Sequence, residues 1–191
     1  AVQAQDAAEA VTADIDMLPV VTDSEEAVKD GAPLLHDEAP GNVCLDFFVG
    51  DHNAIEKAFS SAAHVTKMRI DNTRIVVNAM EPRSVIGEYD PSSERFTVHM
   101  PTQGVMGVRG ALSKAIFKVK PEKIRVLSND VGGSFGMKGA AFVEPISVLY
   151  AARKLSRPVK WTADRSESFL SDHQGRDSII YAELALNASG D

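Results

Sequence analysis

Residues 129–138 read NDVGGSFGMK and follow a strand-like run at 123–128, ahead of a long apolar stretch with the pattern of a helix. Three glycines within five residues let the backbone turn sharply and let a ligand approach it closely. Phe135 places a rigid aromatic ring inside the same turn. This segment, called the glycine loop below, is therefore the first candidate for a binding turn between a strand and a helix.

Strand and helix patterns alternate along the rest of the chain. Alternating apolar residues bounded by turn residues predict strands, and the turn residues at 90–93 predict a hairpin. The expected strands cover 11–16, 64–70, 74–79, 85–89, 95–100, 123–127, 159–162 and 178–186, and the expected helices cover 4–10, 24–29, 51–62, 107–117 and 144–155. The last helix is apolar nearly all round and is expected to be buried. Hairpins mixed with crossover helices predict an α+β, or mixed α/β, fold in which helices pack on mixed sheets.

A loop-like composition at 32–41, with two prolines and a glycine, is the candidate domain boundary. The chain begins at Ala1 without an initiator methionine and ends in a turn that follows a strand-like run. We therefore expect both ends to be cuts and the chain to be a fragment.

Composition excludes several classes of protein. The net charge of −7, with scattered Lys and Arg, argues against a nucleic-acid partner. The single cysteine, Cys44, excludes an internal disulfide framework and a cysteine-rich metal or iron–sulfur site, and its apolar neighbours predict a buried, inert thiol. No run of eighteen apolar residues and no signal-peptide pattern is present, so we expect a soluble, cytoplasmic protein without membrane insertion.

The glycine loop alone leaves more than one interpretation. Its spacing does not match GxGxxG, and Lys138 is not followed by Ser or Thr as in a P-loop, so nucleotide binding is disfavoured. A purely structural turn remains the alternative. Elsewhere, the five histidines lack HxxxH or HExxH spacing, which argues against a zinc site held by the protein. No Ser-His-Asp or Cys-His order supports a nucleophilic hydrolase.

Two further segments give the glycine loop a context. Gln103 lies in MPTQG at 100–104, thirty-two residues before Phe135, and LSRPVKWTADRSE follows at 155–167. In this order and spacing, the three segments resemble the molybdenum-cofactor subunit of the xanthine oxidase family, most closely the large subunits of the carbon monoxide dehydrogenase type. The resemblance covers nearly the whole chain.

The resemblance implies roles for particular residues. The amide of Gln103 would donate a hydrogen bond to an oxo ligand of molybdenum and Phe135 would flank that ligand, so both would lie around the metal without binding it directly. Gly133, Ser134 and Gly136 would complete the cofactor-binding loop, although Ser134 departs from the family, in which many members have a third glycine there. We also expect Gln103 and Phe135 to follow neighbouring strands at one edge of a sheet and to converge within roughly 10 Å.

The resemblance also implies an enzyme larger than this chain. Residues 1–35 would be the tail of a small α+β domain, and residues 36–191 the first part of the cofactor domain. Such enzymes oxidise a small substrate with oxygen from water, using a molybdenum–pterin cofactor in its cytosine dinucleotide or mononucleotide form. Electrons pass to 2Fe-2S clusters and FAD on a small and a medium subunit, in a dimer of heterotrimers. The catalytic glutamate and the copper-binding cysteine of the family lie further toward the C-terminus, so we expect no catalytic residue in this chain and no activity of the chain alone.

The resemblance leaves carbon monoxide, an aldehyde and an N-heterocycle as alternative substrates. A non-catalytic soluble binding or assembly module that keeps the fold is the alternative. Glu81-Pro82-Arg83 is assigned no role, because a strand end closed by proline explains it equally well. The mixed-charge residues at 164–177 are expected to form a solvated surface whose ion pairs contribute little.

Overall fold

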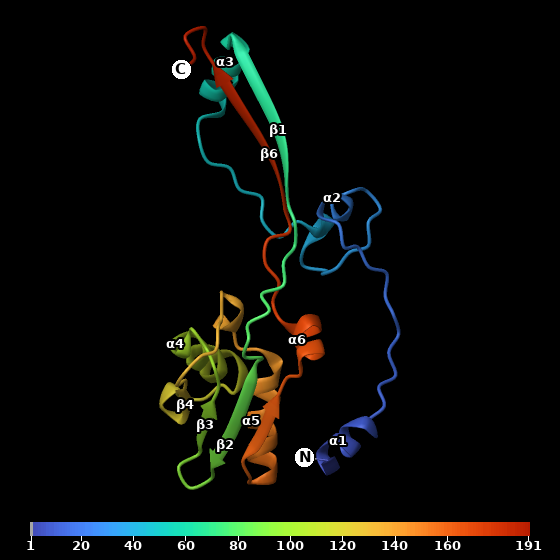
Figure 1. Ribbon diagram of the computed structural model, residues 1–191, viewed down its shortest axis with the longest axis vertical. Helices are drawn as coiled ribbons and strands as arrows, with labels where there is room; N and C mark the ends of the chain where they lie inside the picture. The colour runs from blue at the N-terminus through green and yellow to red at the C-terminus, as the bar shows by residue number, and fades with distance from the viewer. Residues whose placement is uncertain (1) are drawn as a thin grey trace. The chain divides into compact units, whose positions relative to one another are not determined.

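The computed structural model describes residues 2–191, and its contacts divide them into two compact units. One contains residues 2–72 together with residues 178–191, and the other is Thr73–Asp177 (Figure 1). Helices combined with antiparallel and parallel strand pairs confirm the predicted α+β class. The predicted domains at 1–35 and 36–191 concern the organisation of a longer protein and stay a prediction.

A four-stranded sheet, in the order β4-β3-β2-β5, forms the centre of the Thr73–Asp177 unit. β2 Ser84–Asp90 pairs antiparallel with β3 Arg95–His99 across the predicted hairpin. β2 also pairs antiparallel with β5 Val159–Thr162, and β4 Ile124–Leu127 pairs parallel with β3. The sheet is therefore mixed, as the sequence predicts.

The parallel pair requires a crossover between β3 and β4. The chain makes it through α4 Val105–Gly110, the π-helical turn η2 Ala111–Ile116 and the 3-10 turn η3 Pro121–Lys123. A helix at 107–117 is thus confirmed, with its second half wound more widely than an α-helix.

One face of the sheet packs against helices to form the core. Alternate residues of β2, β3 and β4 point to this face, where they meet side chains of α4, η2 and α5 Val143–Leu155 (Figure 1). The buried cluster contains Val85, Phe96, Val98, Met100, Val108, Leu112, Ile124, Val126, Val148 and Leu149. The residues between them on the strands, such as Glu88, Arg125 and Lys160, are exposed. This is the period-two pattern of a sheet covered on one face.

Helix α5 is only partly buried, contrary to its apolar composition. Val148, Leu149 and Ala152 face the sheet, whereas Val143 is 70% and Tyr150 52% exposed. The prediction of a fully buried helix is wrong for the described residues because the sheet covers a single face of it.

The charged residues after β5 form a helix that the sequence did not predict. α6 Arg165–Ser171 begins at Asp164, whose side chain accepts a hydrogen bond from the N–H of Glu167 at 2.7 Å. This is a standard N-cap arrangement. A further 3-10 turn, η4 Met137–Gly139, follows the glycine loop.

The other unit is organised around a two-stranded ribbon. β1 His64–Asn72 pairs antiparallel with β6 Ser178–Leu186 along their whole length. The helices are α1 Val2–Glu9, α2 Ser24–Ala27 and α3 His52–Ser61, with the 3-10 turn η1 Pro40–Asn42 between the last two. No residue among 2–72 and 178–191 is buried.

Two predicted strands are not formed. Residues 11–16 have no strand partner, and Val11 and Ile15 are each 75% exposed, so the alternating pattern alone was insufficient. Of residues 74–79, only Ile75 makes a bridge, to Gly175, and the left-handed φ of 48° at Asn78 interrupts the extended backbone.

The cysteine prediction is also wrong. Cys44 is exposed, as are Leu45 and Phe47 beside it, because this unit has no buried core among the described residues to receive an apolar run. Within residues 2–191, every helix is too short or too polar to cross a membrane.

Candidate functional site

Strand directions bring four connecting segments to one edge of the four-stranded sheet. β3 and β4 run parallel, so residues 100–104 and the glycine loop leave the sheet at the same edge. β2 runs opposite to β3, so residues 79–83, which precede it, lie at this edge too. β5 runs opposite to β2 and sends residues 163–164 there. Segments far apart in the sequence therefore meet at this edge.

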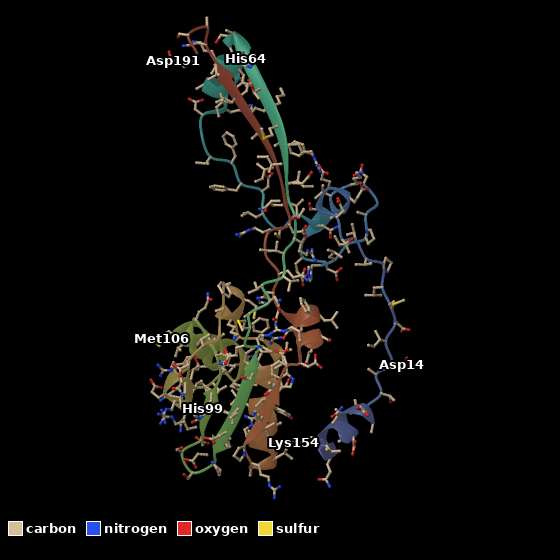
Figure 2. All side chains as sticks on the ribbon, in the orientation of Figure 1. Asp14, His64, His99, Met106, Lys154 and Asp191 are labelled. Carbon is tan, nitrogen blue, oxygen red and sulfur yellow. The ribbon has the colours of Figure 1, made fainter. Side chains whose placement is uncertain are left out.

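Gln103 lies between β3 and α4, and Figure 2 labels the last residue of β3, His99, and a residue of the first turn of α4, Met106. Its side-chain Oε1 accepts a hydrogen bond from the N–H of Gly136 at 3.1 Å. It accepts another from the hydroxyl of Ser134. The expected placement of Gln103 and the glycine loop after neighbouring strands at one edge is confirmed, and the convergence of the Gln103 and Phe135 side chains within roughly 10 Å stays a prediction.

The amide of Gln103 has a defined orientation. A backbone N–H can only donate, so the atom that faces Gly136 is the oxygen. Nε2 then carries two N–H donors, and these make no hydrogen bond within residues 2–191. The side chain therefore offers a neutral donor to a group outside the described protein atoms.

The backbone of the glycine loop is left-handed at three positions. Gly133 and Gly136 have φ of 99° and 95°, which glycine adopts at little cost. Phe135 has φ of 50°, which is unfavourable for a residue with a large side chain, and its ring is 79% exposed. A strained residue that presents an apolar ring to solvent, beside a free amide, is typical of a binding site rather than of a packed turn.

A second set of hydrogen bonds fixes the end of the loop against the turn at 100–104. The carbonyl of Lys138 accepts from the hydroxyl of Thr102 at 2.8 Å and from the N–H of Gln103 at 3.3 Å. The N–H of Lys138 donates to Ser134 Oγ at 3.1 Å. Ser134 thus links the loop to Gln103 by its hydroxyl, a contact that glycine could not make.

Glu81 and Lys138 form an ion pair that sequence reasoning missed. The Lys138 side chain is 0% exposed, and its Nζ lies 2.7 Å from Oε2 of Glu81. The same oxygen accepts the N–H of Gly132 at 2.8 Å. Neither burial nor pairing could be inferred from a lone lysine and a glutamate far upstream, so the sequence carries no local signal for this contact.

Arg83 is the centre of a second, more deeply buried ionic cluster. Its guanidinium binds Asp172 Oδ1 at 2.6 Å and Glu144 Oε2 at 2.5 Å, and their side chains are 3% and 14% exposed against 6% for Arg83. The guanidinium carbon also lies 3.8 Å from the ring centroid of Phe142. The expectation that residues 164–177 are only a solvated surface is therefore wrong at Asp172, and Arg83 has a structural role.

Two of these carboxylates, those of Glu144 and Glu81, are stabilised in their charged form. Partial burial by itself would raise the pKa of Glu144, but the hydrogen bonds and charge of Arg83 outweigh it, so the pKa is lowered. For Glu81, burial likewise acts to raise the pKa, and the hydrogen bonds from Lys138 and Gly132 bring it below its ordinary value.

We expect acid to weaken the Thr73–Asp177 unit through these carboxylates. A pKa lowered on folding adds stability above the unfolded value, about 4.3 for glutamate, and this stability is lost as the pH falls through the folded pKa. The urea midpoint, followed by fluorescence of the single tryptophan Trp161, should therefore fall below about pH 4. Glu144→Gln should lower the midpoint at neutral pH and flatten this fall. The exposed Glu122→Gln is the control, and an equally steep acid loss in Glu144→Gln would contradict the assignment.

Comparisons with known proteins identify the family to which the chain belongs. Residues 35–191 match the family described as the molybdopterin cofactor-binding domain. The gamma subunit of the 6-hydroxypseudooxynicotine dehydrogenase complex of Paenarthrobacter nicotinovorans is 34% identical over 187 residues, covering 98% of this chain and 23% of that protein. The carbon monoxide dehydrogenase large chain of Hydrogenophaga pseudoflava is 29% identical over 199 residues, covering 98% of this chain and 25% of that protein.

Solved structures give the same result. The reconstituted CO dehydrogenase from Oligotropha carboxidovorans superposes with a TM-score of 0.87 at 27% identity, over 96% of this chain and 24% of that one. Quinoline 2-oxidoreductase from Pseudomonas putida 86 superposes with a TM-score of 0.80 at 27% identity, over 96% and 23%. The chain thus spans about a quarter of the length of these relatives. It belongs to the molybdopterin cofactor-binding domain family of molybdenum hydroxylase large subunits.

Proposed function

We propose that the chain acts as part of the catalytic large subunit of a molybdenum hydroxylase and forms one wall of its cofactor pocket. The observation that carries the proposal is the amide of Gln103, whose oxygen is held by the glycine loop while its nitrogen has two donors that bind no group of residues 2–191. A cofactor that presents oxygen acceptors to this nitrogen fits the arrangement. When bound, a molybdenum–pterin cofactor supplies the redox chemistry by which a small substrate is oxidised with oxygen from water.

The residues of the wall have distinct tasks. Gln103 would donate a neutral hydrogen bond, which adds no charge that could shift the redox balance of the metal. The exposed ring of Phe135 would exclude water beside it. Gly133 and Gly136 allow the backbone to approach the cofactor, and Ser134 keeps the amide of Gln103 in its orientation.

The rest of the enzyme belongs to the same proposal. We infer a pterin cofactor in its cytosine dinucleotide or mononucleotide form, with FAD and 2Fe-2S clusters on a medium and a small subunit in a cytoplasmic dimer of heterotrimers. The support is that the relatives are named as large chains, or as subunits of complexes. Because the chain spans about a quarter of their length, the other pocket walls and the catalytic base would come from the remainder of the large subunit.

The proposal makes a direct prediction about molybdenum content. The 191-residue chain alone should hold no stoichiometric molybdenum after purification, because one wall offers too few contacts to retain the cofactor. The complete large subunit, purified with its partners, should hold close to one molybdenum per large subunit by elemental analysis. Absence of molybdenum from the complete enzyme would instead favour the non-catalytic module. Stoichiometric metal in the isolated chain would show that this wall suffices for binding.

A further inference from the structure

We propose that Glu81 is a positioning residue for the free amide nitrogen of Gln103 and acts on it through the buried side chain of Lys138. The inference rests on the proposed function, since it concerns the same donor. The contacts that carry it, however, all lie within the chain itself. No role for Glu81 follows from the fold class or from the glycine pattern.

Glu81 binds the glycine loop at Gly132 and at Lys138. Its Oε2 accepts the N–H of Gly132 at 2.8 Å near the start of the loop and binds Nζ of Lys138, the last residue of the loop, at 2.7 Å. Its own N–H donates to the carbonyl of Gly132 at 3.1 Å. A single carboxylate oxygen therefore links Gly132 to Lys138, and the three left-handed residues of the loop lie between them. Such a backbone keeps its conformation only where surrounding contacts determine it.

Lys138 connects Glu81 to Gln103 through hydrogen bonds of its backbone. Its carbonyl accepts the backbone N–H of Gln103 at 3.3 Å, and its own N–H donates to Ser134 Oγ at 3.1 Å. The Ser134 hydroxyl in turn donates to Oε1 of Gln103. A shift of Lys138 would therefore move both the backbone and the side-chain oxygen of Gln103, and would re-aim Nε2.

The position of Lys138 depends on the charge of Glu81. Because the Lys138 side chain is fully buried, its ammonium group needs an anionic partner, and within residues 2–191 Glu81 is the carboxylate within 4.0 Å of it. The backbone is shaped for this pair as well. A Cβ on Gly132 would lie 2.4 Å from Cβ of Glu81, so only glycine permits the approach.

Amide hydrogen exchange in the 191-residue chain tests the inference without any cofactor. Glu81→Gln keeps the size of the side chain and an acceptor for Gly132 but removes the charge that holds Lys138. We expect the amides of Gly136 and Lys138 to exchange about tenfold faster, as for the loss of one charge-assisted hydrogen bond. The side-chain NH₂ resonances of Gln103 should shift at the same time.

The effect should be local. Exchange at Val98 and Leu149 should stay within about twofold of the wild-type rate, because both belong to the core cluster of the sheet and not to the separate buried cluster that contains Met137 of the loop. Glu94→Gln is the matched control, since it removes the exposed partner of Lys123 at 3.3 Å and should leave Gly136 unchanged. A general loss of protection in Glu81→Gln, at the core as well as the loop, would overturn the inference, because Glu81 would then only stabilise the fold.

Gly132→Ala provides a second, independent variant. The added Cβ must push Glu81 away from the loop, so the same amides should exchange faster although every charge is retained. Unchanged exchange at Gly136 and unchanged Gln103 resonances in either folded variant would overturn the inference. These readouts do not depend on molybdenum, so they distinguish an error about Glu81 from an error about the cofactor.

Discussion

Arg83→Met is expected to lower the free energy of unfolding of the Thr73–Asp177 unit by about 3–5 kcal/mol. The substitution removes a cation from between Asp172 and Glu144, whose side chains are 3% and 14% exposed, and leaves both carboxylates without their counter-charge. Breaking one side of a buried ion pair costs more than the pair contributes, because the remaining charge stays buried. Urea denaturation at neutral pH, followed by the midpoint of the Trp161 fluorescence change, measures the loss.

The control and the rescue make this result specific. Arg125→Met removes an exposed arginine of β4 and should change the stability by less than about 0.5 kcal/mol. Adding Asp172→Asn and Glu144→Gln to Arg83→Met should recover part of the loss, because no unpaired charge remains. A loss below about 1 kcal/mol for Arg83→Met, or no recovery in the triple variant, would contradict the role of the cluster.

Gln103→Ala, made in the complete large subunit, is expected to lower turnover by about one to two decades while the molybdenum content stays close to that of the wild type. One hydrogen bond to a charged or strongly polar acceptor contributes about 1.5–3 kcal/mol, and this converts to that range of rates when the bond matters mainly in the transition state. Turnover with the preferred substrate and elemental analysis of the same preparation measure both quantities.

Gln174→Ala is the matched control for this experiment. Gln174 is an exposed amide of the same unit, and its side-chain oxygen accepts a hydrogen bond from Arg74 at 3.2 Å. Its loss should leave turnover within about twofold of the wild type. Wild-type kinetics in a molybdenum-loaded Gln103→Ala enzyme would show that the free amide is an ordinary solvated group.

The sequence predicts those strands whose alternating pattern also finds a partner. β1 and β6 lie more than one hundred residues apart and both form where expected, because each supplies a long alternating run to the other. Residues 11–16 have a similar pattern without a partner and stay irregular. Alternation describes the faces of a strand but carries no information about what lies beside it.

The difference between a pattern within one segment and the packing between segments also explains which parts of the site could be predicted. The contact between Gln103 and the glycine loop can be predicted because each follows a strand, β3 or β4. These strands are parallel, so both segments leave the sheet at the same edge. The pairs that support the loop do not follow, because Glu81, Lys138 and Arg83 resemble surface residues in sequence. Their burial depends on how loops pack over the sheet edge, which no local pattern of residues encodes.

The two ends of the Thr73–Asp177 unit are neighbours in space. Ile75 is bridged to Gly175, and Arg74 binds the carboxylate of Asp177 at 2.8 Å. The β1–β6 ribbon pairs the flanking residues in the same manner, with Asn72 opposite Ser178. The Thr73–Asp177 unit is thus inserted in sequence between the two paired strands β1 and β6. The chain enters it after Asn72 and leaves it before Ser178, and these two residues are paired. The length and the loops of this unit can therefore vary between homologues without a change in the ribbon that carries it.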